Sequence, residues 1–131
     1  MGDACWDVLI VEDDENLRGT MALCFERAGY RTLVASEGGE ALRLLETGRP
    51  RVILCDLWMP GMGGREFLRL VRERSDLDGI PVFLMTHDER ACQLEADGLL
   101  QKPMRVADLV ALAARHCKAG DRAPPLGAPE H

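Results

Sequence analysis

Five short apolar segments recur along the chain and are separated by stretches of mixed polarity. They cover residues 7–11, 31–35, 51–55, 80–85 and 98–101. The apolar residues in them are mostly consecutive rather than alternating, which is typical of strands buried on both faces of a parallel sheet. The stretches between them carry apolar residues at helical spacing. This alternation predicts an α/β fold with a doubly wound, five-stranded parallel sheet and right-handed crossovers.

The helical stretches carry their own start and stop signals. The first helix should end at Gly29, and Asp13 or Asp14 is a candidate for its N-cap. Ser36 should cap the second helix, which we expect to end near Gly48. The buried face of the third helix should consist of Phe67, Leu68 and Val71. The buried face of the last helix should consist of Val106, Leu109, Val110, Ala113 and Cys117.

Length and composition indicate one globular domain. The chain has 131 residues, and we assign residues 1–118 to the domain and residues 119–131, rich in Pro, Gly and Ala, to a flexible tail. The formal net charge of −6 disfavours nucleic acid and anionic membranes as partners, because binding phosphates requires clustered Lys and Arg. The arginine-rich segment 65–74 is interpreted as a solvated helix face with ordinary charge pairs.

The cysteines and the N-terminus predict a cytoplasmic location. The five cysteines are scattered and show no C-x-x-C spacing, so we interpret them as reduced thiols rather than as disulfides or zinc ligands. The chain start lacks the basic region of a signal peptide, and no apolar run approaches the ~20 residues of a membrane span.

Reactive polar residues follow four of the five predicted strands. In open α/β sheets, ligands bind at the carboxyl ends of the strands, so these residues should gather at one edge of the sheet. They are Glu12, Asp13 and Asp14 after the first strand, Asp56 after the third, Thr86 and His87 after the fourth, and Lys102 after the fifth.

This set of residues fits phosphoryl transfer. Closely packed carboxylates repel one another, so a cation is expected among them. Mg²⁺ suits such a site because one or two carboxylates together with phosphate oxygens can hold it. An Asp beside such a cation, here Asp56, is a competent nucleophile towards a phosphoryl group. Thr86 and Lys102 could bind the phosphoryl oxygens. Taken singly, each of these residues could equally be a helix cap or a surface charge.

The motifs at these positions resemble those of bacterial two-component receiver domains. The first strand and acidic cluster are residues 8–14 (VLIVEDD), and the phosphoacceptor loop corresponds to residues 54–64 (LCDLWMPGMGG). Residues 84–86 (LMT) and 101–103 (QKP) match the switch threonine and lysine–proline motifs. The resemblance covers positions 6–117 and implies a flavodoxin-like receiver fold with strand order 2-1-3-4-5. It also suggests a stand-alone receiver similar to chemotaxis regulators.

The resemblance implies a role for each site residue. Asp56 would be phosphorylated by a histidine kinase, a phosphotransfer protein or a small phosphodonor. Glu12, Asp13, Asp56 and the backbone carbonyl of Trp58 would hold Mg²⁺. Thr86 and Lys102 would bind the phosphoryl group. Output would be contact with a downstream protein target, with homodimerisation also open, and the chain would not be an enzyme acting on an external substrate.

Three features depart from the family pattern. The position three residues before Lys102, aromatic in the family, is Leu99. The segment between Thr86 and the fifth strand is short, so the fourth helix of the family should be shortened or absent. The residue after Thr86, usually small, is His87, and we hypothesise that His87 and Trp58 restrict access of water and phosphodonor to the site.

Other functions stay open at this point. A degenerate receiver would keep the fold and act as an interaction module without phosphorylation. A phosphatase of the aspartyl-phosphate kind would need an Asp two residues after the nucleophile, where this chain has Trp58, which cannot transfer a proton. A dinucleotide-binding module would need a glycine-rich loop after the first strand, where acidic residues stand instead.

Overall fold

The computed structural model describes residues 4–86, 98–101 and 105–117. A five-stranded parallel sheet forms its centre, with the strands in the order β3-β2-β5-β6-β7. These strands are β2 (Val8–Val11), β3 (Thr32–Ala35), β5 (Val52–Asp56), β6 (Val82–Thr86) and β7 (Gly98–Gln101). Counted along the chain, their order in the sheet is 2-1-3-4-5, so the predicted fold is confirmed.

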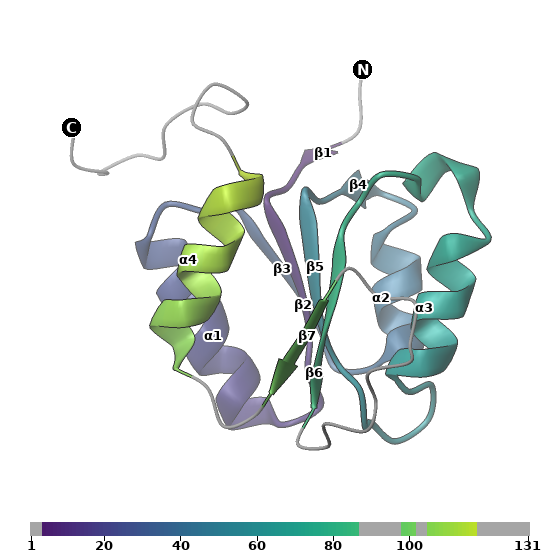
Figure 1. The fold of residues 1–131 in the computed structure, drawn as a ribbon, viewed down its shortest axis with the longest axis horizontal. Coiled ribbons are helices and arrows are strands. Elements are labelled where there is room, and N and C mark those ends of the chain that lie inside the picture. Colours follow the sequence, from purple (N-terminus) through teal and green to yellow (C-terminus); the bar gives the residue numbers. More distant parts are fainter. Residues whose placement is uncertain (1–3, 87–97, 102–104, 118–131) are drawn as a thin grey trace.

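The helices cover the sheet from both sides. Helices α1 (Glu15–Arg27) and α4 (Val106–His116) lie on one face, and α2 (Gly38–Leu44) and α3 (Gly64–Arg72) lie on the other (Figure 1). A short 3₁₀ helix, η1 (Ser75–Leu77), follows α3. None of the helices in the described part of the chain has the length and apolar character that crossing a bilayer requires.

A small parallel pair of strands was not predicted. Ala4 and Cys5 form β1, which pairs with β4, formed by Gly48 and Arg49. These segments are only two residues long, which is too short to produce a periodic apolar pattern in the sequence.

The apolar core divides into two layers because successive residues of each strand point to opposite faces of the sheet. Leu9 and Ile53 pack towards α2 and α3, in the cluster that includes Phe67. Ile10 and Leu54 belong to the opposite cluster, beneath α1 and α4. All four residues of β2 and all five of β5 are buried, which explains why these segments are continuously apolar until Asp56.

The start of α2 differs from the prediction. Glu37, not Ser36, is the N-cap, and its carboxylate accepts hydrogen bonds from the N–H groups of Gly39 and Glu40. Ser36 instead donates from both its N–H and its hydroxyl to Oε1 of Glu40, at 2.7 and 2.9 Å. The expected helix end near Gly48 is also wrong, because α2 ends at Leu44 and Gly48 pairs with β1.

The other predicted helix ends agree with the structure. Asp14 caps α1, and Gly29, just after the helix, has a φ of 99° that favours glycine.

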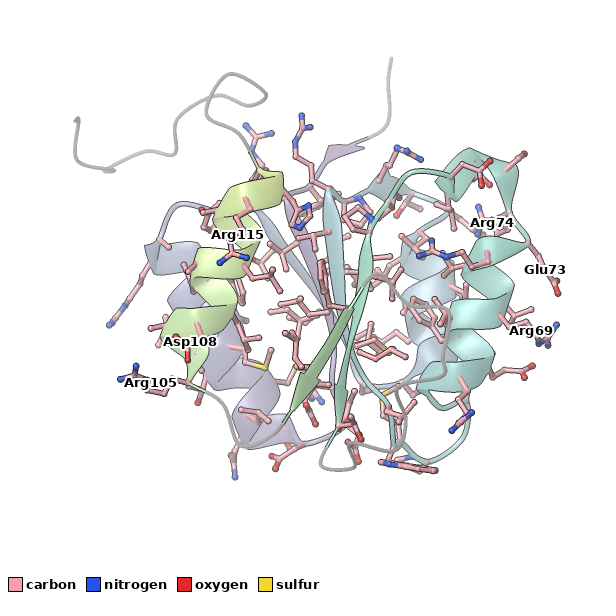
Figure 2. The ribbon with its side chains drawn as sticks, viewed as in Figure 1. Arg69, Glu73, Arg74, Arg105, Asp108 and Arg115 are labelled. Atoms are coloured by element: carbon pink, nitrogen blue, oxygen red, sulfur yellow. The ribbon has the colours of Figure 1, made fainter. Side chains whose placement is uncertain are left out.

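The exposed face of α3 carries ordinary ion pairs, as predicted for the arginine-rich segment, because Arg69 lies 2.8 Å from both Glu66 and Glu73. Figure 2 shows Arg69 and Glu73 directed away from the sheet.

Some predictions fall outside the described residues. These are the shortened fourth helix (residues 87–97, including His87), Lys102 and the tail at residues 119–131. The domain boundary at residue 118 stays a prediction for the same reason. Leu99 lies in β7 with its backbone paired to Leu84, as the sequence predicted for the fifth strand.

Candidate functional site

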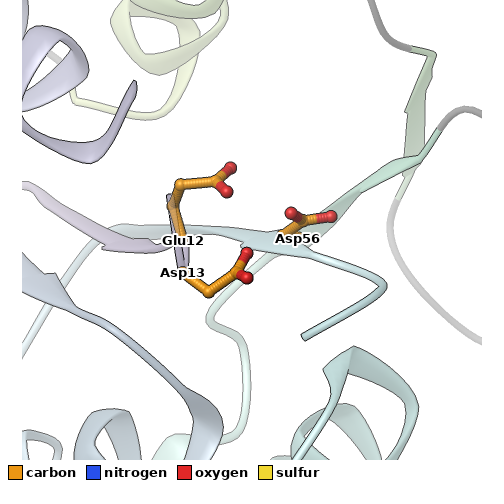
Figure 3. Close-up of side chains that lie close together, drawn as sticks. All are labelled: Glu12, Asp13 and Asp56. Atoms are coloured by element: carbon orange, nitrogen blue, oxygen red, sulfur yellow. The ribbon is translucent and has the colours of Figure 1, made fainter. Parts of the chain in front are cut away.

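Three carboxylates meet at the carboxyl end of the sheet. Glu12 and Asp13 follow β2, and Asp56 is the last residue of the neighbouring strand β5. One oxygen from each of the three lies within 4.8 Å of the others, and Figure 3 shows the three side chains directed towards a common space. Glu12 and Asp56 are buried, with exposed fractions of 1% and 7%, whereas Asp13 is exposed. The predicted acidic cluster therefore forms, open to solvent on the side of Asp13.

The acidic loop between β2 and α1 is held by backbone hydrogen bonds. The N–H of Glu12 donates to the carbonyl of Ala35 on β3, at 3.0 Å. The N–H of Asp14 donates to Oε2 of Glu12 at 3.2 Å, while Oδ1 of Asp14 accepts from the first turn of α1. Asp14 thus serves as a helix cap, which leaves Glu12 and Asp13 as the carboxylates of this loop that face Asp56.

Asp56 is fixed at the end of a central strand. Its register partner on β6 is Met85, whose carbonyl accepts the N–H of Leu57 at 2.8 Å. The N–H of Trp58 lies 3.3 Å from Oδ1 of Asp56 and donates to it. The Trp58 side chain is 60% exposed, so an indole ring stands at the solvent side of the loop that follows β5.

A glycine permits the close approach of α3 to this loop. A Cβ at Gly64 would lie 2.7 Å from the carbonyl oxygen of Asp56 and 2.8 Å from Cα of Leu57. Both are backbone atoms that cannot move aside without displacing the strand end. Gly64 is therefore required so that α3 can pack against the backbone of Asp56 and Leu57. The sequence motif alone does not reveal this reason.

Thr86 lies on the strand next to Asp56. It is the last residue of β6, has an exposed fraction of 2%, and pairs in register with Gln101 at the end of β7. Asp56 and Thr86 therefore end two neighbouring strands at the same edge of the sheet. Lys102, the next residue after Gln101 in the chain, lies outside the described residues.

Cys55 is not a competing nucleophile, although it precedes Asp56. Burial raises the pKa of its thiol far above the ordinary value, and the negative charges of Asp56 and Glu12 raise it further. The thiol donates to the carbonyl oxygen of Asp56 at 3.3 Å. Because the thiolate is the reactive form of cysteine, this side chain stays inert and serves as packing.

The donor set suits a hard divalent cation. All three converging groups offer carboxylate oxygens, and two of them are buried, where unbalanced negative charge is costly. Mg²⁺ accepts oxygen ligands, retains water, and needs only one or two carboxylates from the protein, which matches a cluster that is open on one side. The residues present therefore fit Mg²⁺.

Comparison with known sequences identifies the family. The response regulator receiver domain family matches residues 8–114. A two-component response regulator of rice, ORR6, is 34% identical over 117 residues, which cover 82% of this chain and 69% of that protein. The DNA-binding response regulator MtrA of Mycobacterium tuberculosis is 28% identical over 89% of this chain, which spans about half (53%) of that relative's length.

Comparison with solved structures gives the same result. The chemotaxis protein CheY4 of Vibrio cholerae superposes with a TM-score of 0.79 and 31% identity, covering 87% of this chain and all of that one. The receiver domain of a sensor histidine kinase from Pseudomonas aeruginosa, solved with a magnesium ion coordinated in its active-site cleft, has a TM-score of 0.77 and 25% identity, covering 86% of this chain and 98% of that chain.

Proposed function

This chain belongs to the response regulator receiver domain family of two-component signalling, and we propose that it accepts a phosphoryl group on Asp56 in a reaction that depends on Mg²⁺. The observation that carries the proposal is the convergence of Glu12, Asp13 and Asp56 within 4.8 Å at the end of β2 and β5. A phosphoacceptor needs a fixed carboxylate and a cation beside it, and this cluster offers both the acceptor and the cation ligands.

In the proposed reaction, a carboxylate oxygen of Asp56 attacks the phosphorus of the donor. The bond between phosphorus and the donor's leaving atom breaks, and the electron pair leaves with that atom. The backbone N–H of Trp58 orients the attacking carboxylate through its hydrogen bond to Oδ1. When bound, Mg²⁺ neutralises the negative charge of the phosphoryl oxygens. Its ligands would be Glu12, directly or through water, Asp13, Asp56 and the backbone carbonyl of Trp58.

Thr86 and Lys102 complete the proposed site. The hydroxyl of Thr86, at the end of the strand beside Asp56, would donate to one phosphoryl oxygen. Lys102, which follows β7, would pair with another oxygen. The protein's chemistry ends with its own modification, so we propose no external substrate and no enzymatic turnover beyond loss of the phosphoryl group.

The proposed partners follow from this role. The phosphodonor would be a histidine kinase or a phosphotransfer protein, and the output would be contact with a downstream protein, with homodimerisation as a second route. Relatives such as MtrA are DNA-binding proteins, but this chain spans about half of that protein's length. We propose that the receiver domain itself does not contact nucleic acid. The chain carries a net charge of −6, and Arg69 on α3 is paired with Glu66 and Glu73.

A magnesium titration of the isolated protein tests the metal site. We expect Asp13→Asn to weaken Mg²⁺ binding at least tenfold, because it neutralises one of the three carboxylates that would hold the ion. Even the loss of a group behind a metal ligand typically costs about tenfold or more. Isothermal titration calorimetry measures the change directly. Tryptophan fluorescence provides a second readout, because Trp58, one of two tryptophans in the chain, lies beside the site.

Asp14→Asn is the matched control for this titration. It removes an equal charge from the adjacent position but keeps the oxygen that caps α1, so Mg²⁺ affinity should stay within about twofold. Equal losses in the two variants would mean that net charge in the loop, and not ligation by Asp13, sets the affinity.

A further inference from the structure

The side chain of Arg18 contacts the acidic loop from the first turns of α1. Its Nη1 donates to the carbonyl oxygen of Glu12 at 2.8 Å and lies 3.5 Å from that of Asp13. These carbonyls belong to two of the three residues in the acidic cluster. Arg18 was not among the sequence-predicted site residues, because a contact between a side chain and a backbone carbonyl six residues earlier leaves no motif.

The contact with Arg18 adds to the hydrogen bonds that anchor the two ends of the acidic loop. Glu12 is anchored at one end by its N–H bond to Ala35, and Asp14 is anchored at the other end as the cap of α1. The described hydrogen bonds at the carbonyls of Glu12 and Asp13 come from Arg18. A rotation of either peptide plane would swing the attached carboxylate, so these carbonyls govern where the carboxylates point.

A carboxylate on α2 also acts on the charge of Arg18. Glu40, on α2, has a pKa below its ordinary value, chiefly because Ser36 donates two hydrogen bonds to its carboxylate, with further lowering by the positive charges of Arg18 and Arg43. Glu40 is therefore ionised at neutral pH and attracts Arg18. The guanidinium therefore donates to the carbonyls of the acidic loop and is also attracted by this second negative charge.

We propose that Arg18 is a positioning residue of the magnesium site, which holds the Glu12–Asp13 backbone so that both carboxylates face Asp56. This inference rests on the proposed function and concerns the same site. In this role Arg18 would contact neither the metal nor the phosphoryl group. It acts through the peptide carbonyls behind the ligands, as groups outside the coordination sphere do in other metal sites.

Two other roles for Arg18 predict different results. A positive charge near the site that acts only by repulsion would weaken Mg²⁺ binding in the native protein, so its removal would tighten binding. Arg18 also lines a groove along α1 with Leu23 and Val34. A residue that served only as a partner contact in that groove would leave Mg²⁺ affinity of the isolated chain unchanged.

The test compares Mg²⁺ dissociation constants of the isolated full chain with Arg18→Ala and Arg18→Lys. We expect Arg18→Ala to weaken binding about tenfold, in the range found when groups behind metal ligands are removed. Arg18→Lys should recover part of the loss, because an ammonium group can donate to one carbonyl but lacks the planar fork. In the absence of metal, amide hydrogen exchange at Asp14, whose N–H binds the Glu12 side chain, should be faster in Arg18→Ala.

Arg43→Ala is the matched control. It removes another positive charge that acts on Glu40, from the exposed side of α2, and should change Mg²⁺ affinity less than twofold. Unchanged or tighter binding in Arg18→Ala, with normal binding by the wild type, would overturn the positioning role alone. A wild-type protein that binds no Mg²⁺ would overturn the proposed function and the role of Arg18 with it.

Discussion

Replacing Asp56 with Asn should abolish phosphorylation and, in the absence of metal, make the protein more stable. The amide is not a nucleophile towards phosphorus, so no donor should modify the variant. Three carboxylates with oxygens within 4.8 Å of one another repel, and neutralising one of them should raise the free energy of unfolding by roughly 1 kcal/mol or more. Asn keeps an oxygen that accepts the N–H of Trp58, so the loop geometry is preserved.

Magnesium should reverse this order of stability. At 100 times its dissociation constant, a ligand that binds only the folded state adds about 2.7 kcal/mol to the free energy of unfolding. The wild type should gain this stabilisation, and Asp56→Asn should gain much less because it has lost one ligand. Urea unfolding in chelator and in Mg²⁺ measures both effects. A variant that is less stable than the wild type in chelator would show that the cluster is not repulsive.

The largest effect on stability should come from Phe67→Ala. Phe67 lies on α3, is fully buried, and packs with Leu9 and Ile53 in the layer between the sheet and α2 and α3. Removing a buried phenylalanine side chain costs about 3–5 kcal/mol, from lost burial and from the cavity that remains. A typical domain has a total stability of about 5–15 kcal/mol, so this variant should lose a large part of it.

The matched control for Phe67→Ala is Arg65→Ala on the same helix. Arg65 is exposed, so its removal should change the free energy of unfolding by about 0.5 kcal/mol or less. Urea unfolding of both variants provides the comparison. A loss below about 1 kcal/mol in Phe67→Ala would mean that α3 is not a firm part of the core.

The strands and the acidic cluster were predictable because their signals are local. Continuous apolar runs identified the buried strands, and residues such as Asp56 and Thr86 stood at the strand ends, where the parallel sheet brings them to one edge. The order of the strands came from resemblance to the receiver family rather than from periodicity, which does not specify which strands are neighbours.

The parts that sequence reasoning missed depend on tertiary contacts. Ser36 has the residue type of an N-cap, but the longer Glu37 reaches the first turn of α2, and Ser36 binds Glu40 instead. The two-residue strands β1 and β4 have no pattern of their own and form only because their segments meet in the fold. Arg18 was missed for the same reason, since its role is visible only in its contact with the loop carbonyl of Glu12.

The intact-protein mass after incubation with acetyl phosphate most directly tests whether Asp56 accepts a phosphoryl group. We expect one added phosphoryl mass in the presence of Mg²⁺, none in chelator, and none in Asp56→Asn. Hydroxylamine should also cleave the acyl phosphate by attacking its carbonyl carbon, which releases phosphate and leaves a hydroxamate on Asp56, as expected of a carboxylate acceptor. No adduct on a wild-type protein that also binds no Mg²⁺ would contradict phosphorylation of Asp56 and favour a receiver that acts as an interaction module without phosphorylation.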